Sequence, residues 1–183
     1  MVRLNSKQLR DIPEEIAQTH AEEVKRNPLI LILENVYDTY NIGGLFRLAD
    51  ALAVQKMYLC GEMETPPNHR ILKASVGTYK IVPWEYKATA LEAISAIRST
   101  SPGTQICAVE QSDKSVPYTN VDYSAPVALL VGNETFGVLP ETLDLVDTVV
   151  EIPMWGINKS LNVIVSAGIV SYHVMGQILS SKK

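Results

Sequence analysis

Three short segments of the chain combine flexible backbone with side chains that can hold a ligand or move a proton. In the first segment, Asn41 precedes two consecutive glycines and Arg47. In the second, Glu134 lies between two glycines in the stretch GNETFG. Glycines allow the backbone to approach a ligand closely, and amide, carboxylate and guanidinium groups orient polar substrates or assist proton transfer. Both segments are therefore candidate parts of a binding or catalytic site.

The third segment, EIPMWGINKSLN, places Ser160 at the predicted start of a long apolar helix and Asn162 in the first turn of that helix. All three segments also have a purely structural interpretation. Asn41 and Ser160 are suitable helix N-caps, and Arg47 can simply be solvated. The glycines around Glu134 can shape a tight turn, with the carboxylate stabilising the amino end of the next helix. The residues alone leave both interpretations open.

The elements that must position these segments follow from the hydrophobic pattern. Apolar runs rich in Val, Ile and Leu alternate with amphipathic stretches of helical length, which is typical of a parallel α/β sheet covered on both faces. Ligands of such sheets bind beyond the carboxyl ends of the strands, where the three polar segments fall. The predicted strands are LILILEN (29–35), KMYLCG (56–61), KIVPWEY (80–86), QICAVE (105–110), VALLVGN (127–133) and TVVEIPM (148–154).

Composition limits the class of protein. The chain has 183 residues, 46% of them hydrophobic, enough for one domain with a sizeable core. The net charge of −4 argues against a strongly basic nucleic-acid binder but allows a local basic face. Cys60 and Cys107 lie in apolar surroundings without metal-ligand spacing, so we interpret both as core residues and expect no metal. No apolar run has transmembrane length and the N-terminus is polar, which predicts a soluble cytoplasmic protein without membrane contacts.

The first 28 residues are predicted to form a short helical extension. A polar helix is expected from Ser6 to Arg26, and Asn27–Pro28 should end it because a residue before proline avoids the helical conformation. Dinucleotide and phosphate-loop signatures of the types GxGxxG and GxxxxGK[ST] do not occur in the sequence. A nucleotide- or flavin-dependent enzyme is therefore a weaker hypothesis.

Taken in order, the segments NIGGLFR, VGNETFG…LPETLDLVD and EIPMWGINKSLNVIVSAGI resemble the three motifs of the SpoU (TrmH-type) branch of the SPOUT RNA methyltransferases. The resemblance covers nearly everything from Leu29 to Gln177. It implies a methyltransferase domain over residues 29–183 whose C-terminal part forms a deep trefoil knot. It also implies a homodimer that binds S-adenosylmethionine and methylates a ribose 2′-hydroxyl of tRNA or rRNA.

The resemblance assigns roles to particular positions. One position departs from the family pattern, since Thr135 stands where a further glycine is common. Met154 is expected to join Ile152 and Leu161 in an apolar slot for adenine. The residues matching the polar active-site positions of the family are Asn41, Arg47, Glu134, Ser160 and Asn162. The positions whose backbone would cradle the cofactor are Gly132, Ile152 and Leu161.

Two questions about the chemistry stay open at the level of sequence. Arg47 is either a general base or a clamp on a phosphate beside the hydroxyl, and free guanidinium keeps its proton to a pKa above about 12. A knotted module that binds RNA or S-adenosylmethionine without turnover is the alternative to an enzyme. Candidates for a basic RNA-binding rim are Arg3, Lys7, Arg10, His69, Arg70, Lys73 and Lys159.

Overall fold

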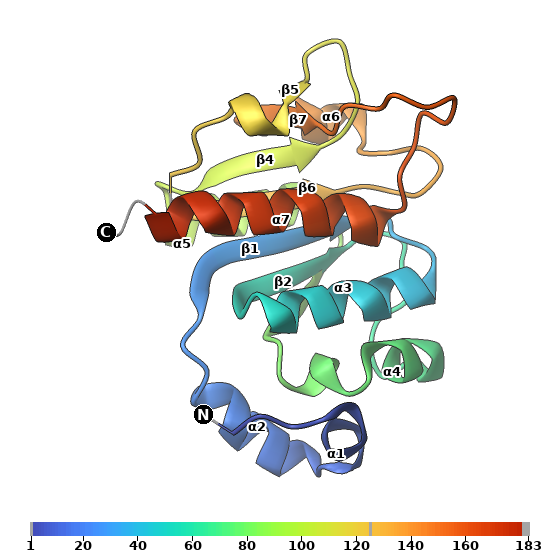
Figure 1. The fold of residues 1–183 in the computed structure, drawn as a ribbon, viewed down its shortest axis with the longest axis vertical. Coiled ribbons are helices and arrows are strands. Elements are labelled where there is room, and N and C mark those ends of the chain that lie inside the picture. The colour runs from blue at the N-terminus through green and yellow to red at the C-terminus, as the bar shows by residue number, and fades with distance from the viewer. Residues whose placement is uncertain (1, 125, 181–183) are drawn as a thin grey trace.

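The computed structural model describes residues 2–124 and 126–180 and contains one seven-stranded sheet in which every strand pairing is parallel. The strand order is β3-β2-β1-β6-β4-β7-β5 (Figure 1). This arrangement confirms the predicted parallel α/β fold. The strands are β1 (Asn27–Glu34), β2 (Val54–Cys60), β3 (Trp84–Lys87), β4 (Gln105–Val109), β5 (Val116–Pro117), β6 (Val127–Val131) and β7 (Thr148–Glu151).

Helices cover both faces of the sheet, because alternate side chains of each strand point to opposite sides. In β1, Leu29, Leu31 and Leu33 pack with residues of α3 and α7, whereas Ile30 and Ile32 pack with α5. Figure 1 shows α3 and α7 in front of the sheet. The helices are α1 (Ser6–Asp11), α2 (Glu14–Glu22), α3 (Thr39–Ala51), α4 (His69–Ser75), α5 (Ala90–Thr100), α6 (Pro140–Leu143) and α7 (Val163–Ser180), with 3₁₀ turns η1 (Thr78–Lys80) and η2 (Tyr118–Asn120).

Three local predictions were wrong. The single helix expected from Ser6 to Arg26 is two helices, because Pro13 holds Ile12 in an extended conformation between α1 and α2. The run KIVPWEY forms a strand only from Trp84, since Lys80 ends η1 and residues 81–83 form an irregular connection. The short strand β5 carries too few residues to produce an alternating pattern and was missed.

The N-terminal extension is packed against the body of the protein. Leu9 and Ala17 form a small apolar cluster with Ile81, which follows η1. The ammonium of Lys80 donates to the backbone carbonyls of Arg10 and Ile12 at 3.0 and 2.9 Å. These contacts hold the end of α1 beside the segment that links α4 to β3.

Among the described helices, α7 is the one whose length and apolarity would suffice to cross a membrane. One face of α7 lies in the core, where Ala167, Val170 and Val174 are buried. The opposite face carries exposed apolar residues at spacings of three, four or seven positions, which we call the α7 stripe. It consists of Leu161 just before the helix, and Val165, Ile169, Tyr172 and Leu179. Cys60 and Cys107 are buried, as predicted.

Candidate active site

The three polar segments meet at the carboxyl edge of the sheet. β1, β6 and β4 are neighbours and β7 lies beside β4, so the residues that follow these parallel strands come together at one edge. The segment after β1 leads into α3, residues 132–137 follow β6, and residues 152–162 connect β7 to α7. Side-chain hydrogen bonds connect these segments to one another.

A chain of side-chain hydrogen bonds joins one residue from each segment. The side-chain amide of Asn41 donates to Oε1 of Glu134 at 2.9 Å. Its carbonyl oxygen accepts from the side-chain amide of Asn162 at 3.0 Å. Oδ1 of Asn162 in turn accepts from the backbone N–H of Ile164 at 2.9 Å. Each amide therefore has one orientation that satisfies its donors and acceptors.

The side chain of Glu134 contacts the residues that directly precede α3, and not the start of α6. Its two carboxylate oxygens accept backbone N–H groups of Tyr37 and Asp38, both at 3.1 Å. Partial burial acts to raise the pKa of Glu134, but hydrogen bonds from Asn41 and from nearby backbone N–H groups outweigh it, so that the pKa lies below its ordinary value. Glu134 is thus an ionised acceptor that holds its neighbours in place.

The loop carrying Glu134 is closed on itself. Asn133 and Gly137 exchange two backbone hydrogen bonds of 3.0 Å each. Gly137 has a φ of 71°, and a Cβ there would collide with the carboxylate of Glu110, while a Cβ at Gly132 would collide with the backbone of Gly137. Both glycines are therefore required by geometry. Thr135 is not among the residues with positive φ, so its β-carbon introduces no strain of that kind.

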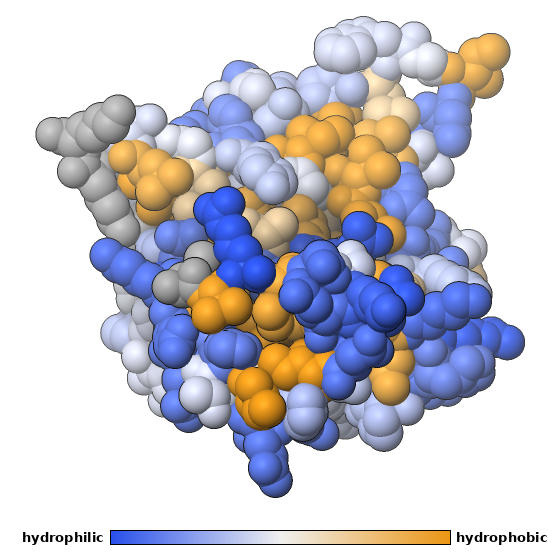
Figure 2. Space-filling model, turned by 60° about the horizontal axis from the view of Figure 1, so that its bottom comes forward, coloured by the Kyte–Doolittle hydropathy of each residue, from blue (hydrophilic) through white to orange (hydrophobic). Residues whose placement is uncertain are grey.

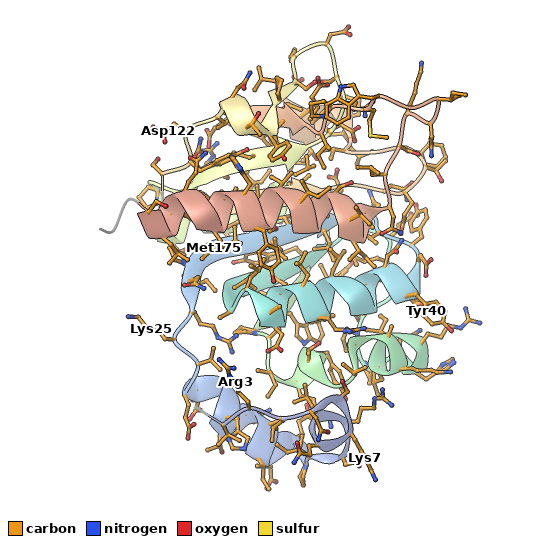
Figure 3. All side chains as sticks on the ribbon, viewed as in Figure 1. Arg3, Lys7, Lys25, Tyr40, Asp122 and Met175 are labelled. Carbon is orange, nitrogen blue, oxygen red and sulfur yellow. The ribbon has the colours of Figure 1, made fainter. Side chains whose placement is uncertain are left out.

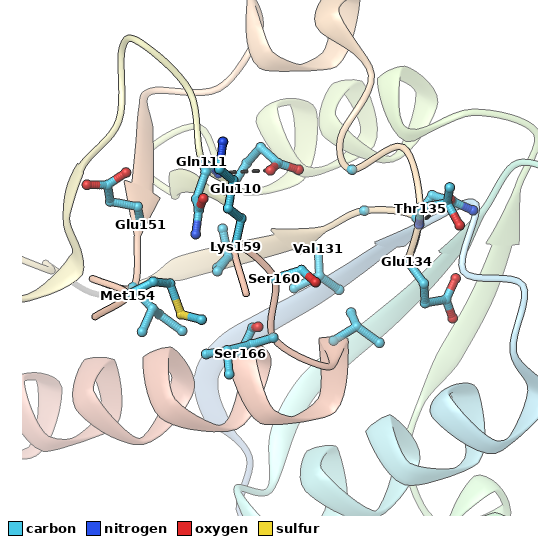
Figure 4. Close-up of a pocket in the computed structure, with 17 residues that line it drawn as sticks. Glu110, Gln111, Val131, Glu134, Thr135, Glu151, Met154, Lys159, Ser160 and Ser166 are labelled. Carbon is cyan, nitrogen blue, oxygen red and sulfur yellow. Dashed lines mark hydrogen bonds between the residues drawn. The ribbon is translucent and has the colours of Figure 1, made fainter. Parts of the chain in front are cut away.

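Two adjacent cavities lie around this loop. The first, of about 190 Å³, is lined by residues 109–111 after β4, by most of residues 131–137, and by several residues between 151 and 166. Figure 4 shows Met154 and Glu151 at one side of this cavity and Glu134 at the other. The second, of about 470 Å³, is lined by Tyr37, Asp38 and Asn41 together with residues near 134 and 160. Glu134, Thr135, Ser160, Leu161 and Val163 line both cavities.

The predicted cofactor residues all line the first cavity. Gly132 contributes from the loop after β6, and Ile152, Met154 and Leu161 contribute from the segment after β7. The apolar residues are accompanied by charged ones, since Glu110, Glu151 and Lys159 also line this cavity. The described residues contain no group of three or more His, Cys, Asp and Glu side chains that could hold a metal ion.

Two predicted helix caps were misplaced by a few residues. Asp38, and not Asn41, caps α3, with its carboxylate accepting from the N–H of Tyr40 at 2.8 Å. Ser160 lies before α7 and bonds through its hydroxyl to Oδ1 of Asn158 at 3.2 Å. Asn162 accepts from the first turn of α7 and therefore takes the capping role. Asn41 does not cap α3, so its side chain is available to link the segments, and Asn162 joins it through its side-chain N–H while its Oδ1 caps α7.

Among the predicted site residues, Arg47 is the one that lines neither cavity of its own chain in the described residues. It is exposed. Gly43 of α3 faces Ala74 of α4, and Gly44 faces Ile164 of α7. Arg47, one turn further along α3, lies on the surface between these two contacts.

Glu110 is a site residue that the sequence analysis missed. Its carboxylate accepts the backbone N–H of Val138 at 2.8 Å and that of Gln111 at 2.8 Å, and its own N–H donates to Val150 in β7 at 3.0 Å. Glu110 thereby ties β4 to β7 and to the end of the Glu134 loop. A charged residue directly after the buried run QICAV was the same strand-exit signal that identified the other segments.

The chain has clear relatives in sequence and in fold. Residues 28–172 match the SpoU rRNA Methylase family, and the chain belongs to this family. The chain is 32% identical over 157 residues to a tRNA (guanosine(18)-2′-O)-methyltransferase of Aquifex aeolicus, covering 85% of this chain and 72% of the relative. It is also 32% identical to the 23S rRNA (guanosine-2′-O-)-methyltransferase RlmB of Neisseria meningitidis, covering 82% of this chain and 61% of RlmB.

A solved structure resembles this one closely. The AdoMet-bound rRNA methyltransferase of Sinorhizobium meliloti aligns with a TM-score of 0.75 and 28% identity, covering 92% of this chain. The chain spans 59% of that protein. It therefore spans about three fifths of the length of both rRNA-modifying relatives and a larger share of the tRNA-modifying one.

Proposed function

We propose that this protein transfers a methyl group from S-adenosylmethionine to a ribose 2′-hydroxyl of tRNA or rRNA. The hydrogen-bonded chain from Glu134 through Asn41 to Asn162, at the boundary of two adjacent cavities, is the observation that carries the proposal. A methyl donor in one cavity and a ribose in the other would meet at the residues that line both. Alignment of two reactants can supply about 7–11 kcal/mol of a reaction barrier.

The first cavity fits S-adenosylmethionine by its chemistry. Ile152, Met154 and Leu161 offer apolar surface for an adenine ring. The carboxylates of Glu110 and Glu151 outnumber the ammonium of Lys159, which suits a ligand with cationic sulfonium and ammonium groups. S-adenosylmethionine, when bound, supplies the activated methyl group.

The residues around the second cavity would hold and orient the ribose. Ser160 offers a hydroxyl, and Asn41 and Asn162 offer amide groups already oriented by their mutual hydrogen bond. Glu134 accepts three hydrogen bonds and has a lowered pKa, so it is a poor proton acceptor and acts by positioning Asn41. The hydroxyl proton then passes to a phosphate or water near the cavity, with Arg47 as the group that grips the phosphate.

Arg47 can take part only if a second copy of the chain is present, and we propose a homodimer formed through the α7 stripe. The stripe leaves Val165 and Leu179 about half exposed, at 47% and 53%. Figure 2 shows apolar surface across the upper part of the view. Arg47 lies on α3 one turn beyond Gly44, which contacts α7, so it is at the edge of this surface. Across a two-fold axis it would reach the site of the partner.

The dimer has a direct test. Ile169→Asp puts a charge in the middle of the α7 stripe, where pairing would bury it, and should give a monomer in sedimentation equilibrium. Tyr86→Asp is the matched control, because Tyr86 is also an exposed large hydrophobic residue but lies in the edge strand β3. This variant should stay dimeric. A wild-type protein that sediments as a monomer would overturn this part of the proposal.

The remaining proposals concern the form of the domain. We propose that residues 29–183 are the methyltransferase domain and that residues 1–28 are an extension packed on it. We also propose that the C-terminal part forms the deep trefoil knot implied by the family resemblance. Its support is that residues 152–162 line the same cavity as the segments after β4 and β6. We further propose that the protein is cytoplasmic, which is consistent with tRNA or rRNA as its substrate.

Methyl transfer itself tests the proposed function. The purified protein is incubated with radiolabelled S-adenosylmethionine and with separated tRNA and rRNA from a strain lacking this gene. Digestion of the RNA should release a 2′-O-methyl nucleoside from one fraction, and Arg47→Ala and Arg47→Lys should both abolish it, because lysine lacks the planar fork. Labelled base in place of labelled ribose would contradict the 2′-hydroxyl as acceptor. Cofactor binding without any transfer would favour a module that binds without turnover.

A further inference from the structure

Four exposed cations lie on two short helices at one side of the molecule. Lys7 and Arg10 are three residues apart on α1, and Arg70 and Lys73 are three residues apart on α4, so each pair shares a helix face. Figure 1 shows α3, α4 and α1 one below another, and Figure 3 shows Tyr40 on α3 and Lys7 on α1 at the same side. Arg3 lies apart from Lys7 in Figure 3.

The two helices are held in a defined relation to each other. Gly77, just after α4, has a φ of 94°, and a Cβ there would collide with the backbone carbonyl of Leu9 in α1. Lys80 donates to the carbonyls of Arg10 and Ile12 at the end of the same helix. These contacts to the backbone of α1 therefore fix α1 beside the segment that directly follows α4, so the two pairs of cations are carried by elements in a defined relation.

These cations are not neutralised by carboxylates. Within residues 2–124 and 126–180, the side-chain ion pairs involve Lys56, Lys87, Arg98 and Lys114, and none involves the four cations of α1 and α4. α4 contains no acidic residue, and α1 contains a single one, Asp11, at its end. The acidic residues of the extension gather on α2 instead, as Glu14, Glu15 and Glu22. Charge is thus segregated in a protein whose net charge is −4.

We propose that α1 and α4 form one docking surface for the sugar-phosphate backbone of the RNA substrate, an inference that rests on the proposed function. Unpaired cations on adjacent helices match a polyanion whose phosphates repeat at short intervals. The surface adjoins the site, because α4 packs against α3 at Gly43, two residues from Asn41. An RNA held along α1 and α4 would therefore lie next to the second cavity. Phosphate contacts of this kind set position and affinity without reading sequence.

The experiment removes charge in matched pairs. One variant carries Lys7→Gln and Arg10→Gln, a second carries Arg70→Gln and Lys73→Gln, and the control carries Lys25→Gln and Lys114→Gln. Lys25 is on the opposite side of the extension in Figure 3, and Lys114 is 79% exposed in the segment between β4 and β5. All three variants lose the same formal charge. Their melting temperatures and affinities for S-adenosylmethionine should match the wild type.

The readouts are the KM for the RNA fraction that accepts label and the dependence of RNA affinity on salt. Each α1 or α4 variant should raise KM about tenfold with kcat kept, and lower the slope of log K against log [salt] by about 1.4 to 1.8. The control should change neither. Equal losses in the control, or unchanged slopes in both test variants, would overturn the docking surface while leaving methyl transfer intact. A wild-type protein that methylates no RNA would instead overturn the proposed function. In that case the salt dependence of binding is measured with total tRNA, so that the docking surface is still tested.

Discussion

The side-chain amide of Asn41 contacts Glu134, 93 residues later in the chain, and its carbonyl contacts Asn162, 121 residues later. Asn41 is 6% exposed whereas Glu134 and Asn162 are exposed, so both hydrogen bonds are part-buried and water is excluded mainly on the side of Asn41. One buried side chain therefore sets the relative positions of the segments after β1, β6 and β7. Hydrogen bonds between a buried amide and a carboxylate contribute about 1.5–3 kcal/mol each, more than a neutral pair on the surface.

Removal of this amide should affect both stability and turnover. We expect Asn41→Ala to lower the free energy of unfolding by about 1–3 kcal/mol, because Glu134 and Asn162 each lose a partner. It should also lower kcat at least tenfold, since the two segments are no longer aligned. Asn68→Ala is the control: Asn68 caps α4, so its loss should cost about 1 kcal/mol of stability without changing kcat. Equal effects of both variants on kcat would mean that Asn41 acts only through stability.

Acid should weaken the site through Glu134. The folded-state pKa of Glu134 lies below the ordinary value of 4.5, so the stability that its ionised form contributes is present above 4.5 and is lost as pH falls through the lowered pKa. Glu134→Gln lacks this ionisation. The difference in unfolding free energy between wild type and Glu134→Gln, measured by urea titration from about pH 7 to about pH 3, should therefore shrink toward the acid end. A difference that stays constant or grows would show that the hydrogen bonds do not favour the ionised form.

Gly137 should tolerate no side chain. In Gly137→Ala the new β-carbon meets the carboxylate of Glu110, and the φ of 71° is strained for any residue with a Cβ. We expect a loss of about 1–3 kcal/mol in stability and weaker binding of S-adenosylmethionine by isothermal titration calorimetry. Gly156→Ala is the matched control, because no atom lies within 4 Å of a Cβ placed there. If Gly137→Ala bound S-adenosylmethionine with wild-type affinity, the closed loop would not be part of the cofactor-binding site.

The sequence predicted the sheet because its central strands are buried on both sides. β1 contains the apolar run LILIL and β6 is apolar throughout, and polar residues that follow these strands line the two cavities. The hydrogen-bond partners could not be predicted in the same way. The structural interpretation of Glu134 placed its carboxylate at the amino end of the next helix, α6, but the carboxylate contacts Tyr37 and Asp38 across the sheet edge. Such pairings depend on strand order, which periodicity does not encode.

The position of Arg47 shows a second feature that the sequence could not predict, namely the direction in which a side chain leaves its helix. Its separation of six residues from Asn41 suggested one shared site, yet six residues on a helix turn the side chain to another face. Gly43 and Gly44 were interpreted as places where a ligand approaches, whereas a Cβ at either would collide with α4 or α7. The positions of Arg47 and of the two glycines could not be predicted for one reason, because a motif lists residues in order and does not say which face of a helix each one occupies.

The first cavity has a consequence for how the chain withstands heat. Its lining comes from three stretches between residues 109 and 166, which are brought together only in the folded state. A ligand that binds the native arrangement and not the unfolded chain raises stability by about 2.7 kcal/mol at a hundred times its dissociation constant. S-adenosylmethionine would then act on the C-terminal half as a removable cross-link. The melting temperature should rise with the concentration of S-adenosylmethionine, and the protein should be cleaved fastest by proteases when that concentration is low.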